Sequence, residues 1–320
     1  MGAKNISKRR TEENNRMVQK ISIIIPAYNE ETNIEPLMEK VNELVKTSDK
    51  DYEVIIVDDG SKDDTYKVAN KLKRKYKYLK VLKHNVNLGK TDAILTGFKN
   101  STGDAICILD ADLQYDPLEI PLLINKLEEG YDIVTGWKKG KYEKKFVSNV
   151  YNFLSRLLFR IHIHDQNSIK IMRREVLEEI NLRKEWHRYI VALAVEKGFK
   201  DGEVKVTLYP RYSGKPKYSG KGRIFIGFLD LLSVKFQISF MKKPLLLFGN
   251  TGIACIVIGF IVGLYDVILR FAFHKGWRPL LYLTMLLIIS GLLLFSIGFL
   301  AEIISRIEER IERIEKELRK

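Results

Sequence analysis

The sequence has few of the residues that build disulfides or histidine-rich metal centres, with two cysteines and five histidines among 320 residues. Cys107 lies in a short apolar run and Cys255 in a long one, so neither is placed for a disulfide, and a reducing cytoplasmic setting fits. His162 and His164 alternate beside Asp165, but no third ligand is apparent, so we interpret them as surface histidines and not as a transition-metal site.

The sequence also lacks the pattern of a signal peptide, the glycine motif of dinucleotide-binding dehydrogenases and the P-loop of Walker-type ATPases. No apolar core follows the basic run at residues 8–10, so we expect residues 1–19 to be a disordered polar tail and not a signal peptide. The first expected strand leads into Pro26-Ala27-Tyr28-Asn29-Glu30, where a dinucleotide-binding dehydrogenase has G-x-G-x-x-G. His84 stands where a P-loop ending in Gly89-Lys90-Thr91 needs glycine. These absences exclude a dehydrogenase and a Walker-type ATPase.

What the sequence has in excess is positive charge and, toward its end, apolar residues. The net charge of +14 favours anionic partners such as lipid headgroups or phosphorylated substrates. Residues 244–269 and 279–300 are each apolar for long enough to span ~30 Å of hydrocarbon. With a membrane segment present, lipid is preferred over nucleic acid as the anionic partner. We therefore expect a soluble domain followed by a two-helix transmembrane anchor in residues 244–300.

The basic residues around the two apolar runs predict their orientation. On the outer flanks they are Lys235, Lys242, Lys243, Arg306, Arg310, Arg313 and Lys316, against Arg270, Lys275 and Arg278 in the connecting loop. Since basic flanks remain in the cytoplasm, we expect a multi-pass cell-membrane protein whose soluble domain faces the cytosol. Residues 221–243 are apolar with polar interruptions, so they are expected to form amphipathic interfacial helices.

Short apolar runs alternate with helical periodicity between residues 20 and 135. Strands are expected at residues 21–25, 54–57, 79–82, 105–109 and 132–135, with helices between them. This alternation predicts an α/β domain with a Rossmann-like, mostly parallel sheet. Polar residues gather at the carboxyl ends of the strands, where such sheets bind ligands. They are Tyr28, Glu30, Asp58, Asp59, Asp110 and Asp112.

Asp110, Asp112 and Gln114 follow one of these strands, and an extended chain would send their side chains to the same side. Carboxylate and amide oxygens suit Mg2+ or Mn2+, whose coordination shell is commonly completed by substrate phosphates. The alternative is that the two aspartates cap the helix that begins at Pro117. The sequence thus offers either a metal–diphosphate site or a helix cap at this strand end.

Four motifs occur in a set order along the chain. They are Pro26-Ala27-Tyr28-Asn29-Glu30, Val57-Asp58-Asp59-Gly60-Ser61, Asn87-Leu88-Gly89-Lys90 and Asp110-Ala111-Asp112-Leu113-Gln114. In this order they resemble the family 2 glycosyltransferases of GT-A fold, and more narrowly the dolichyl- or polyprenyl-phosphate mannose and glucose synthases. The resemblance covers about residues 20–240 and implies that residues 20–220 form a GT-A catalytic domain.

The resemblance also implies roles on the donor side. Contacts to the base and ribose of GDP-mannose or UDP-glucose are implied for Pro26, Ala27, Tyr28, Glu30 and Asp58. Asp110, Asp112 and Gln114 would hold Mg2+ or Mn2+ against the diphosphate, with Ala111 among the donor contacts. Arg211 and Lys217 match basic positions that close over the diphosphate, and Arg188 is a further candidate. The alternative for these basic residues is a solvated loop at the membrane surface.

On the acceptor side, the resemblance implies that Lys144 and Ser148, on a helix expected over residues 144–160, bind the lipid phosphate, with Lys145 as an alternative to Lys144. Asp165 matches an aspartate near the acceptor and would orient it, completing a catalytic set with Asp110 and Asp112. A phosphate acceptor whose second pKa lies near ~6 is largely deprotonated at neutral pH. A single inverting displacement, helped by positioning and electrostatics, is therefore expected.

These features together predict a metal-dependent inverting glycosyltransferase that moves mannose or glucose to a polyprenyl or dolichyl phosphate. A processive polysaccharide synthase is the nearest alternative, but Gln-x-x-Arg-Trp and further spans are not visible. A second alternative is a non-catalytic nucleotide-binding membrane scaffold. The intact metal-ligand motif argues against it.

The last twenty residues carry a heptad pattern. Its apolar positions are Leu300, Ile304, Ile307, Ile311, Ile314 and Leu318, four and three residues apart in turn. In residues 301–320 this predicts either a coiled coil that joins copies into a homo-oligomer or an amphipathic helix laid on another surface.

Overall fold

The computed structural model describes residues 17–139, 156, 161–212, 235–236, 244–274 and 278–318. The chain forms two compact units, Met1–Phe225 and Ile226–Lys320. Several predicted features lie outside the described residues. They are residues 1–16 of the expected tail, the helix at residues 144–160, of which only Arg156 is described, and residues 221–243, of which only Lys235 and Phe236 are described. The predicted site residues Lys144, Lys145, Ser148 and Lys217 also lie outside the described residues.

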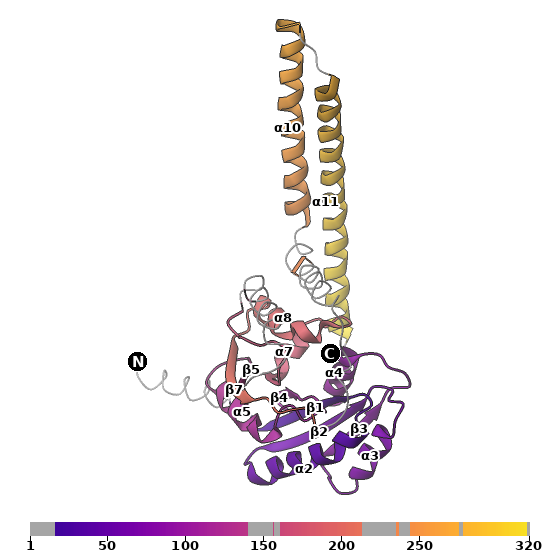
Figure 1. Cartoon of the computed structure of the whole chain (residues 1–320), viewed down its shortest axis with the longest axis vertical. Helices are drawn as coiled ribbons and strands as arrows, with labels where there is room; N and C mark the ends of the chain where they lie inside the picture. Colours follow the sequence, from indigo (N-terminus) through magenta and orange to yellow (C-terminus); the bar gives the residue numbers. More distant parts are fainter. Residues whose placement is uncertain are drawn as a thin grey trace, which may run out of the picture. The chain divides into compact units, whose positions relative to one another are not determined.

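The first unit is built on a seven-stranded sheet with the order β3-β2-β1-β4-β6-β5-β7 (Figure 1). The strands are β1 (Lys20–Ala27), β2 (Asp51–Asp58), β3 (Leu79–Lys83), β4 (Ala105–Ile108), β5 (Ile133–Lys139), β6 (Lys170–Arg173) and β7 (Asp201–Thr207). Strands β3, β2, β1 and β4 are parallel neighbours, β5 is parallel to β7, and β6 runs antiparallel to β4 and β5. The prediction of a mostly parallel α/β sheet is confirmed, although β6 and β7 were not predicted.

Helices cover both faces of this sheet. They are α2 (Glu31–Thr47), α3 (Thr65–Leu72), α4 (Lys90–Lys99), η1 (Pro117–Glu119), α5 (Ile120–Glu128), α7 (Arg174–Glu179), η2 (Trp186–Tyr189) and α8 (Ile190–Glu196). The apolar face of α2 joins α5 and the side chains of Ile23 and Ile25 in one core. Helix α4 packs on the opposite face, where a Cβ at Gly97 would lie 2.5 Å from Ile24 Cγ2. Burial on both faces explains why the strands are continuous apolar runs.

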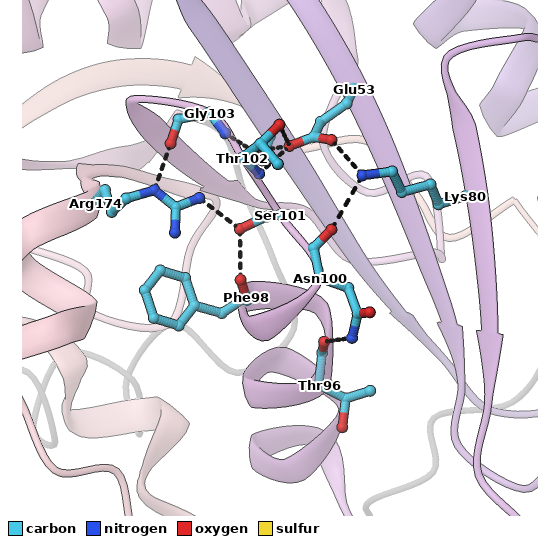
Figure 2. A network of polar contacts seen from close by, with 10 residues as sticks. Glu53, Lys80, Thr96, Phe98, Asn100, Ser101, Thr102, Gly103 and Arg174 are labelled. Atoms are coloured by element: carbon cyan, nitrogen blue, oxygen red, sulfur yellow. Dashed lines mark hydrogen bonds and ion pairs between the residues drawn. The ribbon is translucent and has the colours of Figure 1, made fainter. Parts of the chain in front are cut away.

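At the amino edge of the sheet, Glu53 is the centre of a polar network (Figure 2). Ser22 Oγ donates to Glu53 Oε1 at 2.6 Å, Lys80 Nζ donates to Oε2 at 2.9 Å, and the backbone N–H of Thr102 also donates to Oε1. Burial acts to raise the pKa of Glu53, but these hydrogen bonds and the Lys80 ammonium lower it to about 2. The network ties β1, β2, β3 and the loop before β4 together, away from the edge that carries the predicted ligand residues.

Arg174 extends this network from the first turn of α7 (Figure 2). Its Nε donates to the carbonyl of Gly103 and its Nη2 to Ser101 Oγ, each at 2.8 Å, while its guanidinium lies 5.0 Å from the centre of the Phe98 ring. The arginine thereby joins α7 to the loop that connects α4 with β4.

The second unit contains two long helices, α10 (Pro244–Ala272) and α11 (Arg278–Leu318), side by side in Figure 1. They approach closely at Gly252 and Gly291, since a Cβ on either glycine would lie 2.6 Å from the carbonyl oxygen of the other. Pro244–Ala272 and Pro279–Glu308 are long and apolar enough to cross a membrane. In the most apolar stretch of 18 residues, 17% of the first helix and 6% of the second is buried. Because most of this apolar surface is uncovered, the helices are not the interior of a soluble core, and membrane association follows.

Candidate active site

Parallel strands bring the predicted donor residues to one edge of the sheet. In the register of β1 and β2, Ala27 lies opposite Asp58, and β4 continues beside β1 into Asp110. Ala27 is buried, and Pro26 and Tyr28 on either side of it are half-buried. The carboxyl ends of three neighbouring strands therefore hold the first, second and fourth motifs at a single place, as expected for a ligand-binding edge.

Asp58 has the clearest unmet hydrogen-bonding capacity at this edge. Its residue surface is 0% exposed, and its Oδ1 accepts one hydrogen bond from the backbone N–H of Ser61 at 3.2 Å. Its Oδ2 is buried with no hydrogen-bond partner among the described residues. A buried carboxylate oxygen without a donor is costly, so an N–H or O–H group of a bound ligand would relieve that cost.

Glu30 lies beside Asp58 in the expected donor set and is also buried. Asn33 Nδ2 donates a hydrogen bond to Glu30 Oε2, and the backbone N–H of Glu30 donates one to Thr65 Oγ1 at 2.8 Å. The carboxylate is therefore held at the start of α2. The preceding Asn29 has φ of 52°, a left-handed conformation that asparagine tolerates, and it turns the chain from β1 into this helix.

Asp59 organises the third motif, a role that the sequence did not reveal. Its two carboxylate oxygens accept hydrogen bonds from the backbone N–H groups of Leu88 and Gly89, each at 2.9 Å. His84 Nδ1 lies 2.7 Å from the same carboxylate. Gly89 has φ of 103°, which favours glycine, and α4 begins directly after it at Lys90. Asp59 thus positions the first residue of α4 at the edge of the site.

Lys90 forms an ion pair with Asp110 Oδ1. Partial burial acts to raise the pKa of Asp110, but the Lys90 ammonium outweighs this effect and holds the pKa below its ordinary value. Asp110 is thus ionised at neutral pH. The Asn87-Leu88-Gly89-Lys90 motif contributes a cation to the carboxylate site, which its spacing alone did not indicate.

The chain from Asp110 to Gln114 is a turn, so the expectation of an extended chain there was wrong. Strand β4 ends at Ile108, and Leu113 has φ of 58°. The backbone N–H of Gln114 donates to Asp112 Oδ1 at 3.2 Å across the turn. A left-handed residue breaks the alternation on which the expectation depended.

The turn nevertheless brings Asp112 and Gln114 to one partner. Arg211 Nη2 lies 2.8 Å from Asp112 Oδ2 and 3.5 Å from Gln114 Oε1. The helix-cap alternative is wrong, because Asp116 is the residue that accepts the hydrogen bond of Leu118 N at the start of η1, at 3.2 Å. Neither Asp110 nor Asp112 is therefore used as the cap of this helix.

The chemistry of these oxygens fits a hard divalent cation. Burial raises the pKa of Asp112, and the neighbouring Asp110 carboxylate raises it further, while Arg211 only partly offsets both effects. Two carboxylates and an amide oxygen are suitable ligands for Mg2+ or Mn2+. No group of three or more His, Cys, Asp or Glu side chains gathers as a metal site within the described part of the chain. An ion held by Asp110 and Asp112 would therefore leave coordination positions for substrate oxygens.

Asp165 is buried on the β5–β6 side of the same sheet. Lys138 Nζ lies 2.9 Å from its Oδ2, and the backbone N–H of Asn167 donates to its Oδ1 at 3.0 Å. Lys138 belongs to β5, so the Gly136-Trp137-Lys138 segment supplies the counterion of the predicted acceptor-side aspartate.

The two histidines near Asp165 are held by different carboxylates of β7. His162 Nδ1 lies 3.2 Å from Asp201 Oδ1, and His164 Nδ1 lies 2.6 Å from Glu203 Oε1. His164 also stacks on Trp137 with ring centres 4.3 Å apart. His162 is a surface residue, as expected, while His164 is only partly exposed, and the two do not share a carboxylate.

Two further polar residues lie in this region, Lys170, which the sequence did not indicate, and His187, which is expected to be a structural or donor-side residue. Lys170 is 6% exposed and begins β6. His187 Nδ1 lies 3.0 Å from Thr91 Oγ1. Burial, and to a smaller extent the positive charge of nearby Lys90, lowers the pKa of the His187 imidazole to about 3. His187 is therefore neutral at physiological pH. Arg188, the further diphosphate candidate, follows it in η2 and is half-buried.

Residues 22–181 match the family described as "Glycosyl transferase family 2". The dodecaprenyl-phosphate galacturonate synthase of Rhizobium johnstonii is 33% identical over 297 residues, which are 89% of this chain and 88% of that protein. An undecaprenyl-phosphate 4-deoxy-4-formamido-L-arabinose transferase of Klebsiella pneumoniae is 29% identical over 300 residues, 91% of this chain and 89% of that protein.

The fold is also similar to that of solved proteins. Glucosyl-3-phosphoglycerate synthase from Mycobacterium tuberculosis, crystallised with Mn2+ and uridine-diphosphate-glucose, matches with a TM-score of 0.55 and 18% identity over 73% of this chain and 82% of that one. At this identity the likeness shows the fold alone. Together with the family match and the relatives, it establishes that this chain belongs to glycosyl transferase family 2 and is a glycosyltransferase with a GT-A-like α/β fold.

Proposed function

We propose that this glycosyltransferase moves a sugar from a nucleotide-sugar donor to a polyprenyl phosphate. The observation that carries the donor half is the placement of Asp58, Asp110 and Asp112 at one sheet edge, with a buried Asp58 oxygen that lacks a partner. A base or ribose donor group at Asp58 would leave the diphosphate near the carboxylate pair. The acceptor half is supported by the names of the Rhizobium and Klebsiella relatives, both of which include a polyprenyl phosphate.

For the donor, we assign Asp110, Asp112 and Gln114 to a Mg2+ or Mn2+ ion, and Pro26, Ala27, Tyr28, Glu30, Asp58 and Ala111 to the nucleotide. The bound ion would supply Lewis-acid chemistry, offsetting negative charge on the leaving diphosphate. Lys90 and Arg211 now neutralise the two aspartates. The N–H groups of these two cations would be well placed to donate to diphosphate oxygens of a donor bound beside the carboxylates. Arg188 and Lys217 remain proposed donor residues, and Lys217 lies outside the described residues.

For the acceptor, we assign Asp165 and its partner Lys138 to the side from which the lipid phosphate attacks, with Lys144 and Ser148 as further phosphate ligands. An acceptor oxygen forms a bond to the anomeric carbon while the bond from that carbon to the diphosphate breaks. The bonding electron pair leaves with the nucleoside diphosphate, and the configuration at carbon inverts. The phosphate is largely dianionic at neutral pH, so Asp165 orients the acceptor and is not required as a base.

The sugar is proposed to be a hexose, with GDP-mannose or UDP-glucose as donor. The relatives are named for galacturonate and for 4-deoxy-4-formamido-L-arabinose, so a donor panel should include nucleotide-linked forms of these two sugars. We assign residues 20–220 to catalysis, 221–243 to the membrane interface, 244–300 to the anchor and 301–320 to a C-terminal helix. Both flanks of the anchor are proposed to be cytoplasmic, because basic residues are more numerous there than in the connecting loop.

Radiolabelled transfer tests this proposal directly. Detergent-solubilised protein is incubated with each donor, undecaprenyl phosphate and Mn2+, and the organic extract is separated by chromatography. We expect one labelled lipid-linked monosaccharide. The Asp112→Ala variant should lose at least ~100-fold in rate while keeping its melting temperature, since it removes a metal ligand. A labelled polymer would point to a processive synthase. Absence of any labelled product over the whole panel, or full activity of the variant, would refute the proposal.

A further inference from the structure

Lys170 is a buried cation at the junction of the donor and acceptor sides. It lies opposite Ile108 of β4 and Thr135 of β5 in the sheet register. Its residue surface is 6% exposed. Asp110 and Asp165 both act on it electrostatically, as do the lysines at positions 90 and 138. Among the described residues, none makes a hydrogen bond or ion pair with its Nζ.

Three carboxylates of the proposed site already have other cationic partners. Lys90 is paired with Asp110, Arg211 with Asp112, and Lys138 with Asp165. Lys170 is a fourth cation in this part of the site, and none of these three carboxylates forms an ion pair with it.

A lysine whose side chain is almost entirely buried, without an ion pair for its ammonium, is unfavourable for folding. Burial, followed by repulsion from Lys90, lowers the pKa of Lys170 to about 8, despite the opposing influence of the two aspartates. An apolar side chain of similar length would avoid this cost. A lysine at this position is therefore better explained by something that it binds than by a contribution to stability.

We infer that the Lys170 ammonium binds a phosphate oxygen of the substrates, because Lys170 lies on β6 between β4, which leads into Asp110, and β5, which carries the Asp165 partner Lys138. The inference rests on the proposed function for the identity of the phosphates, which are the diphosphate of the donor or the phosphate of the lipid acceptor. An anionic oxygen would supply the missing charge partner, and in a buried setting such a charge-assisted hydrogen bond is strong. Lys170 would then hold one reacting phosphate in position for the displacement.

Binding measurements on the full-length protein in detergent test this inference without requiring turnover. Pyrophosphate with Mn2+ represents the donor diphosphate, and undecaprenyl phosphate represents the acceptor, each titrated by calorimetry. Lys170→Met removes the charge, Lys170→Gln provides a second neutral variant, and Lys170→Arg retains the charge. Lys205→Met is the matched control, since Lys205 lies on β7 with its Nζ 5.2 Å from the centre of the Trp137 ring.

We expect both neutral variants to bind one of the two probes at least ~10-fold more weakly, with Lys170→Arg less affected and Lys205→Met unchanged. Weakened pyrophosphate binding assigns Lys170 to the donor, and weakened binding of undecaprenyl phosphate assigns it to the acceptor. The melting temperatures of the neutral variants should be equal to that of the wild type or higher. Unchanged binding of both probes, or a lowered melting temperature with unchanged binding, would overturn the inference. A wild-type protein that binds pyrophosphate through Lys170 yet forms no lipid-linked sugar would refute only the proposed function.

Discussion

Arg211 Nη2 lies 2.8 Å from Asp112 Oδ2, so a guanidinium from the segment after β7 is the charge partner of a carboxylate that we assign to the metal ion. The same nitrogen lies 3.5 Å from Gln114 Oε1. Arg211 thus contacts two of the three proposed metal ligands. We therefore expect a metal ion at Asp112 to compete with this ion pair.

Arg211→Met should make the stability of the protein depend more strongly on Mn2+. Loss of the guanidinium leaves Asp112 beside Asp110 without its partner, so the melting temperature in EDTA should fall by about 3–6 °C. Added Mn2+ should restore it, giving a larger Mn2+-induced rise than in the wild type, because binding to the folded state adds stability. Differential scanning fluorimetry measures both values. Lys67→Met, which removes an exposed ion pair with Asp64, is the control. Equal Mn2+ shifts in Arg211→Met and the wild type would contradict this competition.

Asp58→Asn should weaken nucleotide binding while preserving the fold. The amide oxygen can still accept the hydrogen bond of Ser61 N, but the second carboxylate oxygen, which has no partner in the structure, is replaced by a donor group. A hydrogen bond to a charged acceptor contributes about 1.5–3 kcal/mol, so affinity for UDP or GDP with Mn2+ should fall roughly 10- to 100-fold. Calorimetry on both nucleotides measures this. The exposed Asp64→Asn is the control, and unaltered affinity in Asp58→Asn would remove Asp58 from the donor site.

Much of the sheet edge was predictable because parallel strands place their carboxyl ends together. Strand ends before Asp58 and Asp110 could be identified from apolar runs, and the motif order indicated the family. The contact between Arg211 and Asp112 could not be predicted, because the two residues are far apart in the sequence and the contact depends on the left-handed turn at Leu113. Lys170 was also missed, because its position depends on β6 inserting antiparallel between β4 and β5. Short strands of this kind carry too little periodicity to be recognised in a sequence.

Glu53→Gln should reduce the acid sensitivity of the catalytic unit. In the folded state the pKa of Glu53 is about 2, below its ordinary value, so its ionised form adds stability that is fully present above about pH 4.5. That stability is lost as the pH falls toward 2. Between about pH 4.5 and pH 2, protonation of Glu53 should therefore lower the unfolding free energy of the wild type by ~2–3 kcal/mol. The variant should lack this contribution to the decline. Tryptophan fluorescence during urea unfolding at several pH values measures it.

The control for Glu53 is Glu129→Gln, whose carboxylate forms an exposed ion pair with Lys126. This variant should retain the wild-type pH dependence, because exposed ion pairs contribute little. Identical acid profiles for wild type and Glu53→Gln would show that the network in Figure 2 does not depend on an ionised Glu53.

The heptad positions of α11 leave two alternatives, self-association of copies or a helix that lies on another surface, and each makes a different prediction. Leu300, Ile304, Ile307, Ile311 and Ile314 are each between 52% and 59% exposed, and they form one stripe on a continuous helix. In heptad terms Ile304 and Ile311 occupy a positions, and Ile307 and Ile314 occupy d positions. Isoleucine at both positions favours trimers or tetramers over dimers. For the self-association alternative, light scattering in detergent should give three or four copies, and Ile307→Asn should lower that number. Oxidative cross-linking in a Cys255→Ser background should be efficient for Ile307→Cys and weak for Arg306→Cys, which lies one residue outside the seam. A monomer, or equal cross-linking at both positions, would instead favour a helix that lies on another surface.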